Sequence, residues 1–252
     1  MARRAYLGGV LLSAATLAAA WAVLTYGGVV PPLFLPSPSD VVRSALSLLR
    51  EGSLWVHTRA SLLVIVTGWA LAAAVAVPLG ILMGTLKMVE AVVEPLVDFV
   101  RYLPVSAMIP LLILYIGIGT AEKVAVIFIG TFFQLVLLVA DVSATVSKDL
   151  LDSAYTLGAG RRTVFTRVLV PATLPGVMDN LRITMGWAWT YLIVAELVSA
   201  DRGLGYLILD AMRGLNTDRI FVGLLVIGLL GLGFDMLFKW LHRVLLPWSP
   251  RI

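Results

Sequence analysis

A polar segment in the second half of the chain has residue types and spacing that suit contact with a soluble partner. It begins Asp152-Ser153-Ala154-x-x-x-Gly158, and Val168-x-Val170-Pro171 starts ten residues after the glycine. Strongly apolar stretches lie on both sides of it. Because polar residues are costly inside lipid, we expect this segment at the membrane surface, where a soluble protein can bind it.

The same segment contains the signals of a short helix with an apolar stripe. Ser147 is a suitable N-cap, and the acidic residues that follow it favour the positive end of a helix dipole. Leu150, Ala154 and Leu157 lie at i, i+4 and i+7 and therefore share one face. Gly158 can adopt the left-handed conformation that ends a helix.

A second helical piece is predicted from about Thr163 to Leu169, before Pro171 and Pro175 begin the next membrane span. Arg161 and Arg162 precede this piece and can pair with acidic groups of a protein or with lipid phosphate. The alternative interpretation of residues 147–170 is an ordinary connection whose apolar residues rest on the membrane surface.

Ionisable residues within apolar stretches are the next candidates, because a charge at membrane depth usually faces a cavity or a partner. Glu196 is expected either to line the outer part of a solute pathway or to pair with an arginine such as Arg202. Two other sets of charged residues at i, i+3 are expected to pair with each other or to snorkel to the membrane surface, in either case without contacting solute. They are Asp179 with Arg182, and Asp98 with Arg101.

Uncharged residues can also line a pathway for an anion, because hydrogen-bond donors and half-helix N-termini hold an anion less firmly than permanent cations do. The candidates are Ser106, Met108, Trp187, Trp189 and Thr190. Ordinary helix packing is the alternative explanation, above all for the tryptophans.

The composition is that of a protein that crosses a membrane several times. Hydrophobic residues make up 60% of the chain and charged residues 13%, with a mean hydropathy of +0.98. Soluble domains have about twice that share of charged residues. Several apolar runs reach the roughly 20 residues that a membrane-spanning helix needs. We predict an all-α bundle in one domain, residues 1–252, with about six spans near residues 6–30, 62–86, 105–118, 124–146, 175–199 and 220–241.

Further features describe the ends and connections of these spans. A short amphipathic helix is predicted over residues 39–50 at the outer surface, and a polar loop over residues 200–219. Pro104 and Pro110 predict that the third span is bent or broken. The start of the chain resembles a signal peptide, but its apolar run is longer than a signal core, which favours an uncleaved span. A small excess of Lys and Arg places both termini and the loops at 87–94 and 147–170 in the cytoplasm.

Several classes of activity are disfavoured by missing motifs. The chain has no phosphate-binding G-x-x-x-x-G-K-[ST] loop, no H-E-x-x-H and no G-x-S-x-G, so we expect neither catalysis nor ATP binding in this chain. Cysteine is absent, and the two histidines, His57 and His242, fall near span ends. No basic stripe with interleaved aromatic residues predicts nucleic-acid binding.

The polar segment resembles the EAA signature, EAA-x3-G-x9-I-x-L-P, of the permease subunits of binding-protein-dependent ABC importers. The spacing agrees throughout, with Asp152 for Glu, Ser153 for the first Ala, and Val168 and Val170 for Ile and Leu. Other segments, in order, resemble the nitrate, sulfonate, taurine and bicarbonate branch of that family. They include Leu35-Pro36-Ser37-Pro38-Ser39, Val77-Pro78-Leu79-Gly80, Glu94-Pro95-Leu96, Ile109-Pro110-Leu111, Ala195-Glu196 and Gly203-Leu204-Gly205-Tyr206.

The resemblance implies a type I ABC importer-like bundle and a set of partners. Two permease copies, expected as a homodimer, would form the pore in the bacterial inner membrane. Two ATPase subunits would bind ATP and Mg, and a soluble binding protein would deliver a small oxyanion or sulfonate. The segment containing Asp152, Leu157, Gly158 and Pro171 would insert into a groove of the ATPase. Val64 and Tyr102 depart from the family pattern, and similar permeases are thought to carry vitamin precursors, so the substrate stays open.

An ion-coupled secondary transporter is the competing hypothesis. It would use Glu196, Asp179 and Asp141 as coupling carboxylates, and it usually has an inverted internal repeat. No convincing repeat is found, and one long polar inner loop fits a transporter subunit better than a self-sufficient carrier.

Overall fold

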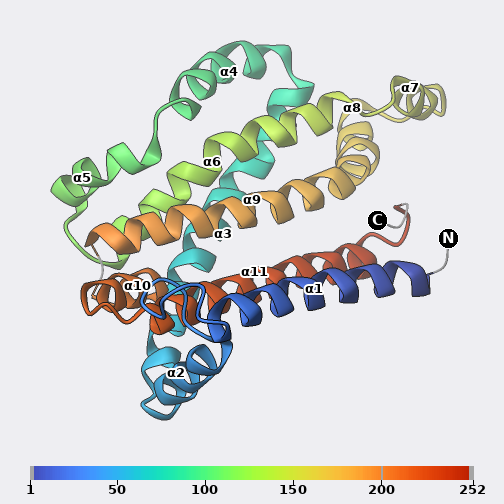
Figure 1. Cartoon of the computed structure of the whole chain (residues 1–252). Helices are drawn as coiled ribbons and strands as arrows, with labels where there is room; N and C mark the ends of the chain where they lie inside the picture. Colours follow the sequence, from blue (N-terminus) through green and yellow to red (C-terminus); the bar gives the residue numbers. More distant parts are fainter. Residues whose placement is uncertain (1–2, 200, 250–252) are drawn as a thin grey trace.

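A computed structural model of the chain describes residues 3–199 and 201–249, and this part of the molecule is helical and has no β-strand (Figure 1). The predicted all-α class is confirmed. The helices are α1 (Arg3–Tyr26), α2 (Pro38–Arg50), α3 (Ser53–Thr85), α4 (Lys87–Arg101), α5 (Val105–Ile116), α6 (Thr120–Ala144), α7 (Lys148–Thr156), α8 (Arg161–Val164), the π-helical turn η1 (Phe165–Leu169), α9 (Val170–Ser199), α10 (Leu204–Arg213) and α11 (Thr217–Leu245).

Membrane crossing is best supported for α3, α6 and α11, the described helices whose length and composition suit a span. α4 and α5 meet the same criteria together and are bent by 96° between them, which confirms the break expected near Pro104. α5 has 12 residues, about 18 Å, so the predicted third span cannot cross alone and needs α4. α9 is long enough to cross, with 30 residues, but it carries charged side chains and does not meet these criteria. The apolar part of α1, Leu12–Tyr26, is shorter than the criteria require. The count of six spans therefore stays a prediction.

The centre of the bundle is a close crossing of α3 and α6. A side chain at Gly68, Gly80 or Gly84 of α3 would overlap atoms of α6, including the carbonyl oxygen of Ala140 at the third site. Such small residues let two backbones approach in a membrane, where helix association depends on close packing. Buried aliphatic residues of α3, α6 and α9 fill the spaces on both sides of this crossing.

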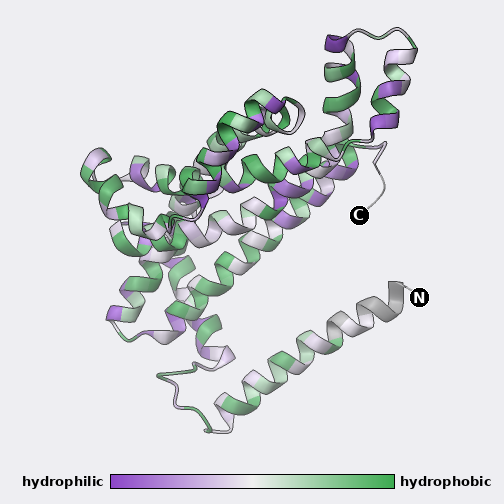
Figure 2. Ribbon diagram, turned by 90° about the horizontal axis from the view of Figure 1, so that it is seen from above, coloured by the Kyte–Doolittle hydropathy of each residue, from purple (hydrophilic) through white to green (hydrophobic). Residues whose placement is uncertain are grey.

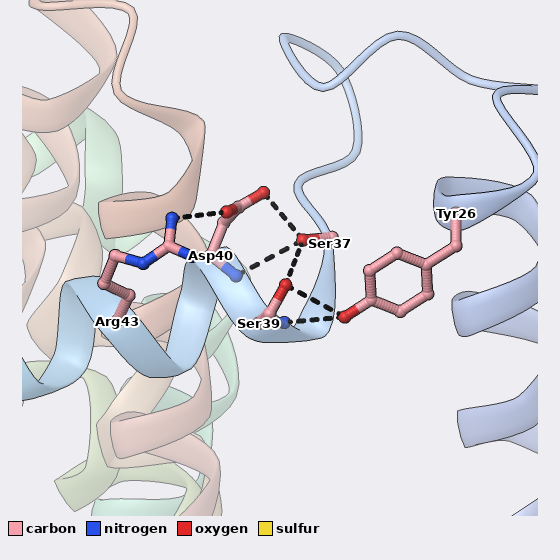
Figure 3. A network of polar contacts seen from close by, with 5 residues as sticks. All are labelled: Tyr26, Ser37, Ser39, Asp40 and Arg43. Carbon is pink, nitrogen blue, oxygen red and sulfur yellow. Dashed lines mark hydrogen bonds and ion pairs between the residues drawn. The ribbon is translucent and has the colours of Figure 1, made fainter.

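α1 and α2 form the outer part of the N-terminal half. Figure 2 shows α1 standing apart from the other helices, and Trp21 near its end stacks on Phe221 of α11 with ring centroids 6.0 Å apart. The predicted amphipathic helix over residues 39–50 is confirmed as α2. Its N-terminus is held by Ser37, whose hydroxyl accepts from the Asp40 amide and donates to the Asp40 carboxylate, while Tyr26 bonds Ser39 (Figure 3).

Several predicted boundaries were wrong, two of them because short amphipathic helices look polar in sequence. Residues 87–94, expected as a loop, are the first half of α4, and residues 200–219, expected as a polar loop, contain α10. α10 buries Leu204, Leu207 and Ala211 at helical spacing and leaves its polar side outside. α9 begins at Val170 and not near Pro175, because both prolines are accommodated within its first turns.

Candidate functional site

The polar segment forms a separate structure at one end of the bundle. Figure 1 shows α7 projecting beyond α8 at the end where α1 begins and α11 ends, while α2, α5 and α10 lie at the opposite end. No residue of α7 is buried, and Leu157 is 88% exposed. Leu150 is also exposed, whereas Leu151 packs against a hydrophobic cluster of the bundle. The predicted stripe of Leu150, Ala154 and Leu157 therefore lies free of the rest of the described chain except for partial cover of Ala154.

The C-terminal end of α7 is a Schellman motif. The Ala159 amide donates to the Ala154 carbonyl at 3.1 Å, and the Gly158 amide donates to the Tyr155 carbonyl at 2.9 Å. Gly158 has φ +84°, the left-handed conformation expected for it, and nothing lies within 4 Å of where a Cβ would stand. Its requirement for glycine therefore comes from backbone conformation and not from space.

The other predicted residues of the segment are arranged around this motif. Asp152 and Ser153 are exposed on α7, and the Ser153 hydroxyl donates to the Asp149 carbonyl at 2.6 Å. Ser147 stands at the N-cap as expected, but its side chain makes no capping hydrogen bond. Arg161 and Arg162 are exposed in α8.

A π-helical turn joins the segment to α9. The Val170 amide donates to the Phe165 carbonyl, a bond one residue longer than in an α-helix. Pro171 has no amide and its ring would clash with the carbonyl four residues back, so the wider turn relieves that conflict. The chain is consequently helical from Arg161 to Ser199, which connects the polar segment directly to the far end of the bundle.

A cavity of about 360 Å³ lies between the α4–α5 elbow and helices α6 and α9. Two predicted pathway residues, Ser106 and Thr190, line it. Met108 and Trp187 are not among its lining residues, and Trp189 is buried in the main core. Arg101, Gln134 and Tyr191 also line the cavity, and the sequence contained no signal that identified Gln134 or Tyr191.

Glu196 lies outside this cavity, in a buried contact between α9, α3 and the start of α10. Its Oε1 accepts from the Ser61 hydroxyl at 2.6 Å, and its Oε2 accepts from the Gly205 amide at 2.7 Å. The Ser61 oxygen in turn accepts from the Leu204 amide at 2.8 Å. The carboxylate therefore caps the N-terminus of α10, where the positive end of the helix dipole stabilises its negative charge. The expected partner of Glu196, Arg202, lies beside Asp201 instead.

The backbone at this contact is shaped for the carboxylate. The amide of Gly203 donates to His57 Nδ1 at 3.1 Å, so three consecutive amides are held by three side chains. Gly203 has φ +125°, and a Cβ there would overlap the carboxylate of Glu196. We call this set of residues, His57, Ser61, Glu196 and Gly203–Gly205, the amide clamp.

The expected i, i+3 ion pairs have different outcomes. Asp98 and Arg101 form theirs, with Arg101 Nε 3.1 Å from the carboxylate, as predicted. The expected pair of Asp179 with Arg182 is wrong, because Arg182 Nε lies 2.8 Å from Asp235 of α11. Lys239 also contacts Asp235, at 2.6 Å, so one carboxylate ties α9 to α11 between two cations.

Known proteins with similar sequences and folds were found. Residues 76–248 match the family model described as binding-protein-dependent transport system inner membrane component. A probable ABC transporter permease protein of Brucella abortus (strain 2308) is 39% identical over 250 residues, 99% of either chain. The taurine transport system permease protein TauC of Escherichia coli (strain K12) is 32% identical over 252 residues, 96% of this chain and 91% of TauC. The MetNI methionine ABC transporter, in an inward-facing conformation, superposes with a TM-score of 0.66 at 20% identity over 78% of this chain and 95% of that chain, which supports the fold.

Proposed function

This chain belongs to the family of binding-protein-dependent transport system inner membrane components, and from that membership we propose the residues and the solute class of its transport function. It is a permease subunit of an ABC importer. The proposed solute is a small sulfonate or related oxyanion. The cavity of about 360 Å³ carries this proposal, because hydrogen-bond donors and one arginine line it, and TauC, a similar chain, belongs to a taurine transport system.

The proposed contact with the ATPase is the exposed stripe of α7, with the Schellman motif and Arg161 and Arg162 beside it. A helix-in-groove contact needs an apolar face at i, i+4 and i+7, and Leu150, Ala154 and Leu157 supply one. The continuous helix behind the stripe supports this role, since a stiff element can transmit displacement from a partner into the bundle.

A charge placed on the stripe tests this contact. Leu157→Glu is expected to reduce copurification of the ATPase with the permease by tenfold or more, because a charge would have to be buried in an apolar groove. Leu33→Glu, at an exposed leucine in the connection between α1 and α2, is the matched control and is expected to retain the ATPase. Equal copurification in both variants would contradict the docking role of α7.

The solute class is tested by transport. The permease, its ATPase and its binding protein are reconstituted in proteoliposomes, and uptake of taurine, methanesulfonate, nitrate and an uncharged aminopyrimidine is measured with and without ATP. Saturable, ATP-dependent uptake of a sulfonate or nitrate is expected. Uptake of the pyrimidine alone would overturn the proposed class while leaving the importer mechanism in place.

A second copy of this chain is the proposed partner within the membrane. Both termini of each copy are proposed to lie in the cytoplasm. The exposed apolar residues of α5, including Leu111, Leu114 and Tyr115, and an exposed strip of α9 near Trp187 support a face that another copy covers. Because the native chain has no cysteine, Leu114→Cys introduces a single thiol for cross-linking. A disulfide-linked dimer on mild oxidation is expected, whereas a uniformly monomeric product would contradict this interface.

A further inference from the structure

Arg101 occupies an unusual place in the bundle, at the elbow where α4 ends and α5 has not yet begun. Its Nε lies 3.1 Å from Asp98, its Nη2 donates to the Tyr102 hydroxyl at 3.0 Å, and its guanidinium carbon lies 4.7 Å from the centroid of the Tyr102 ring. A guanidinium has five N–H donors. The contacts in the described part of the chain use only some of them, and the arginine lines the cavity between α5, α6 and α9.

The polar side chains around this cavity also have donors to spare. Most serines and threonines of these helices donate to a carbonyl of the preceding turn, as Thr131, Ser143 and Thr184 do. Ser106 and Thr190 line the cavity and make no such bond within the described residues. The side chains of Gln134 and Tyr191 likewise have no hydrogen bond there. Ser106 and Thr190 are exposed in the single chain, and Gln134 and Tyr191 are partly buried, so these donors are open to an acceptor that enters the cavity beside the arginine.

From this arrangement we infer that the cavity is an anion-binding site of the permease itself, in which Arg101 binds the oxyanion head of the solute. Ser106, Gln134 and Thr190 donate to its oxygens, and the apolar part of the lining contacts its carbon chain. Naming a sulfonate as that oxyanion rests on the proposed function, whereas the preference for an anion rests on the cavity alone.

The ion pair with Asp98 adjusts the strength of this site. An arginine without a counter-ion beside this cavity would hold an anion tightly, and a transport site must also release it. Asp98 is outside the cavity lining but partly neutralises the guanidinium, so the cavity attracts an anion only moderately. Removing Asp98 and removing Arg101 therefore have opposite effects on anion binding, although each removes the same ion pair.

This opposition gives a test that needs neither the binding protein nor ATP hydrolysis. Ser106→Cys introduces a single thiol into the cavity of a chain without cysteine. The thiolate is treated with 2-sulfonatoethyl or 2-aminoethyl methanethiosulfonate, and it forms a mixed disulfide while methanesulfinate leaves. The ratio of the anionic to the cationic reaction rate measures the preference of the cavity for a sulfonate, with the permease–ATPase complex in nanodiscs and labelling followed by intact mass.

Arg101→Gln is expected to lower this ratio roughly fivefold or more, and Asp98→Asn to raise it by a similar factor, from the Coulomb energy of one charge within several ångströms. Arg101→Lys is expected to restore most of the ratio. Val29→Cys, an exposed site outside the cavity, is the control whose ratio neither variant changes. Equal shifts in the same direction for Arg101→Gln and Asp98→Asn would overturn the inference, because that result describes a structural ion pair only.

A second measurement uses the unaltered arginine and so does not depend on how the Arg101 variants fold. Methanesulfonate is expected to slow the cationic labelling of Ser106→Cys at least threefold, while dimethyl sulfone, its uncharged analogue of similar shape, has no effect. Equal effects of the two compounds would also overturn the inference. If the cavity prefers anions but no sulfonate, nitrate or related oxyanion is transported, the anion site stands and the proposed solute class fails.

Discussion

Removing the carboxylate of Glu196 should destabilise the buried contact between α9, α3 and the start of α10. Glu196→Ala leaves the Ser61 hydroxyl and the Gly205 amide buried without an acceptor, since both donate to that carboxylate. Each unsatisfied buried donor costs about 1–3 kcal/mol, so the free energy of unfolding should fall by roughly 2–6 kcal/mol. Glu196→Gln keeps one acceptor oxygen and should cost about 1–2 kcal/mol.

The assay is thermal unfolding of the purified importer complex in nanodiscs, followed by tryptophan fluorescence. Glu51→Ala provides a matched control, because Glu51 accepts from the Ser47 hydroxyl at 2.6 Å, the same distance as in the amide clamp, but on an exposed surface. There water replaces the lost partner, and the expected change is under about 0.5 kcal/mol. An unfolding temperature of Glu196→Ala within 2 °C of that of Glu51→Ala would refute the assignment of Glu196 as the cap of α10.

A double-mutant cycle separates the carboxylate from the backbone conformation. Gly203→Ala alone should destabilise strongly, because its Cβ overlaps Glu196 and because φ is +125°. In the Glu196→Ala background the overlap disappears and only the backbone strain remains. The two costs should therefore be less than additive by about 1 kcal/mol or more, and strict additivity would contradict the described contact.

Two further changes test the packing of the bundle by the same assay. Gly84→Val should prevent the close crossing of α3 and α6, since its Cβ would overlap the Ala140 carbonyl oxygen. The free energy of unfolding should fall by about 2 kcal/mol or more. Gly228→Ala is the control: nothing lies near its Cβ position, so the change should be neutral or slightly stabilising. Asp235→Ala should lower the unfolding temperature more than Arg182→Met does. Losing Asp235 leaves both Arg182 and Lys239 without their counter-ion, whereas losing Arg182 leaves the pair of Asp235 with Lys239 intact. The reverse order of unfolding temperatures would contradict this interpretation of the ion-pair geometry.

Local patterns predicted the polar segment well because its structure depends on neighbours in sequence. The left-handed Gly158, the end of α7 and the shared face of Leu150 and Leu157 all follow from spacing within a few turns. The ion pair of Asp98 with Arg101 was predicted correctly for the same reason. The π-helical turn was not predicted, since it results from the combined demands of Pro171 and of a helix that continues without interruption on both sides.

Contacts between distant segments were beyond the reach of such patterns. The partner of Glu196 is Ser61, 135 positions earlier, and the partner of Arg182 is on α11. In both cases the sequence offered a nearby residue of opposite charge, Arg202 for Glu196 and Asp179 for Arg182. The fold instead brings the Ser61 hydroxyl to Glu196 and the Asp235 carboxylate to Arg182. The cavity depends on the bend between α4 and α5, whose direction no single residue specifies, so Gln134 and Tyr191 could not be recognised as its lining.

The position of α9 relates these separate sites mechanically. This helix is continuous with the π-helical turn and α8 at one end, presents Thr190 to the cavity in its second half, and ends in the amide clamp at Glu196. If α7 receives a displacement from an ATPase as proposed, α9 carries it past the cavity to α10, because the clamp fixes the two helices together through buried hydrogen bonds. Glu196→Gln should then weaken coupling at the outer end, so that uptake falls more than ATP hydrolysis does. A parallel loss of both activities would show that the clamp contributes stability alone.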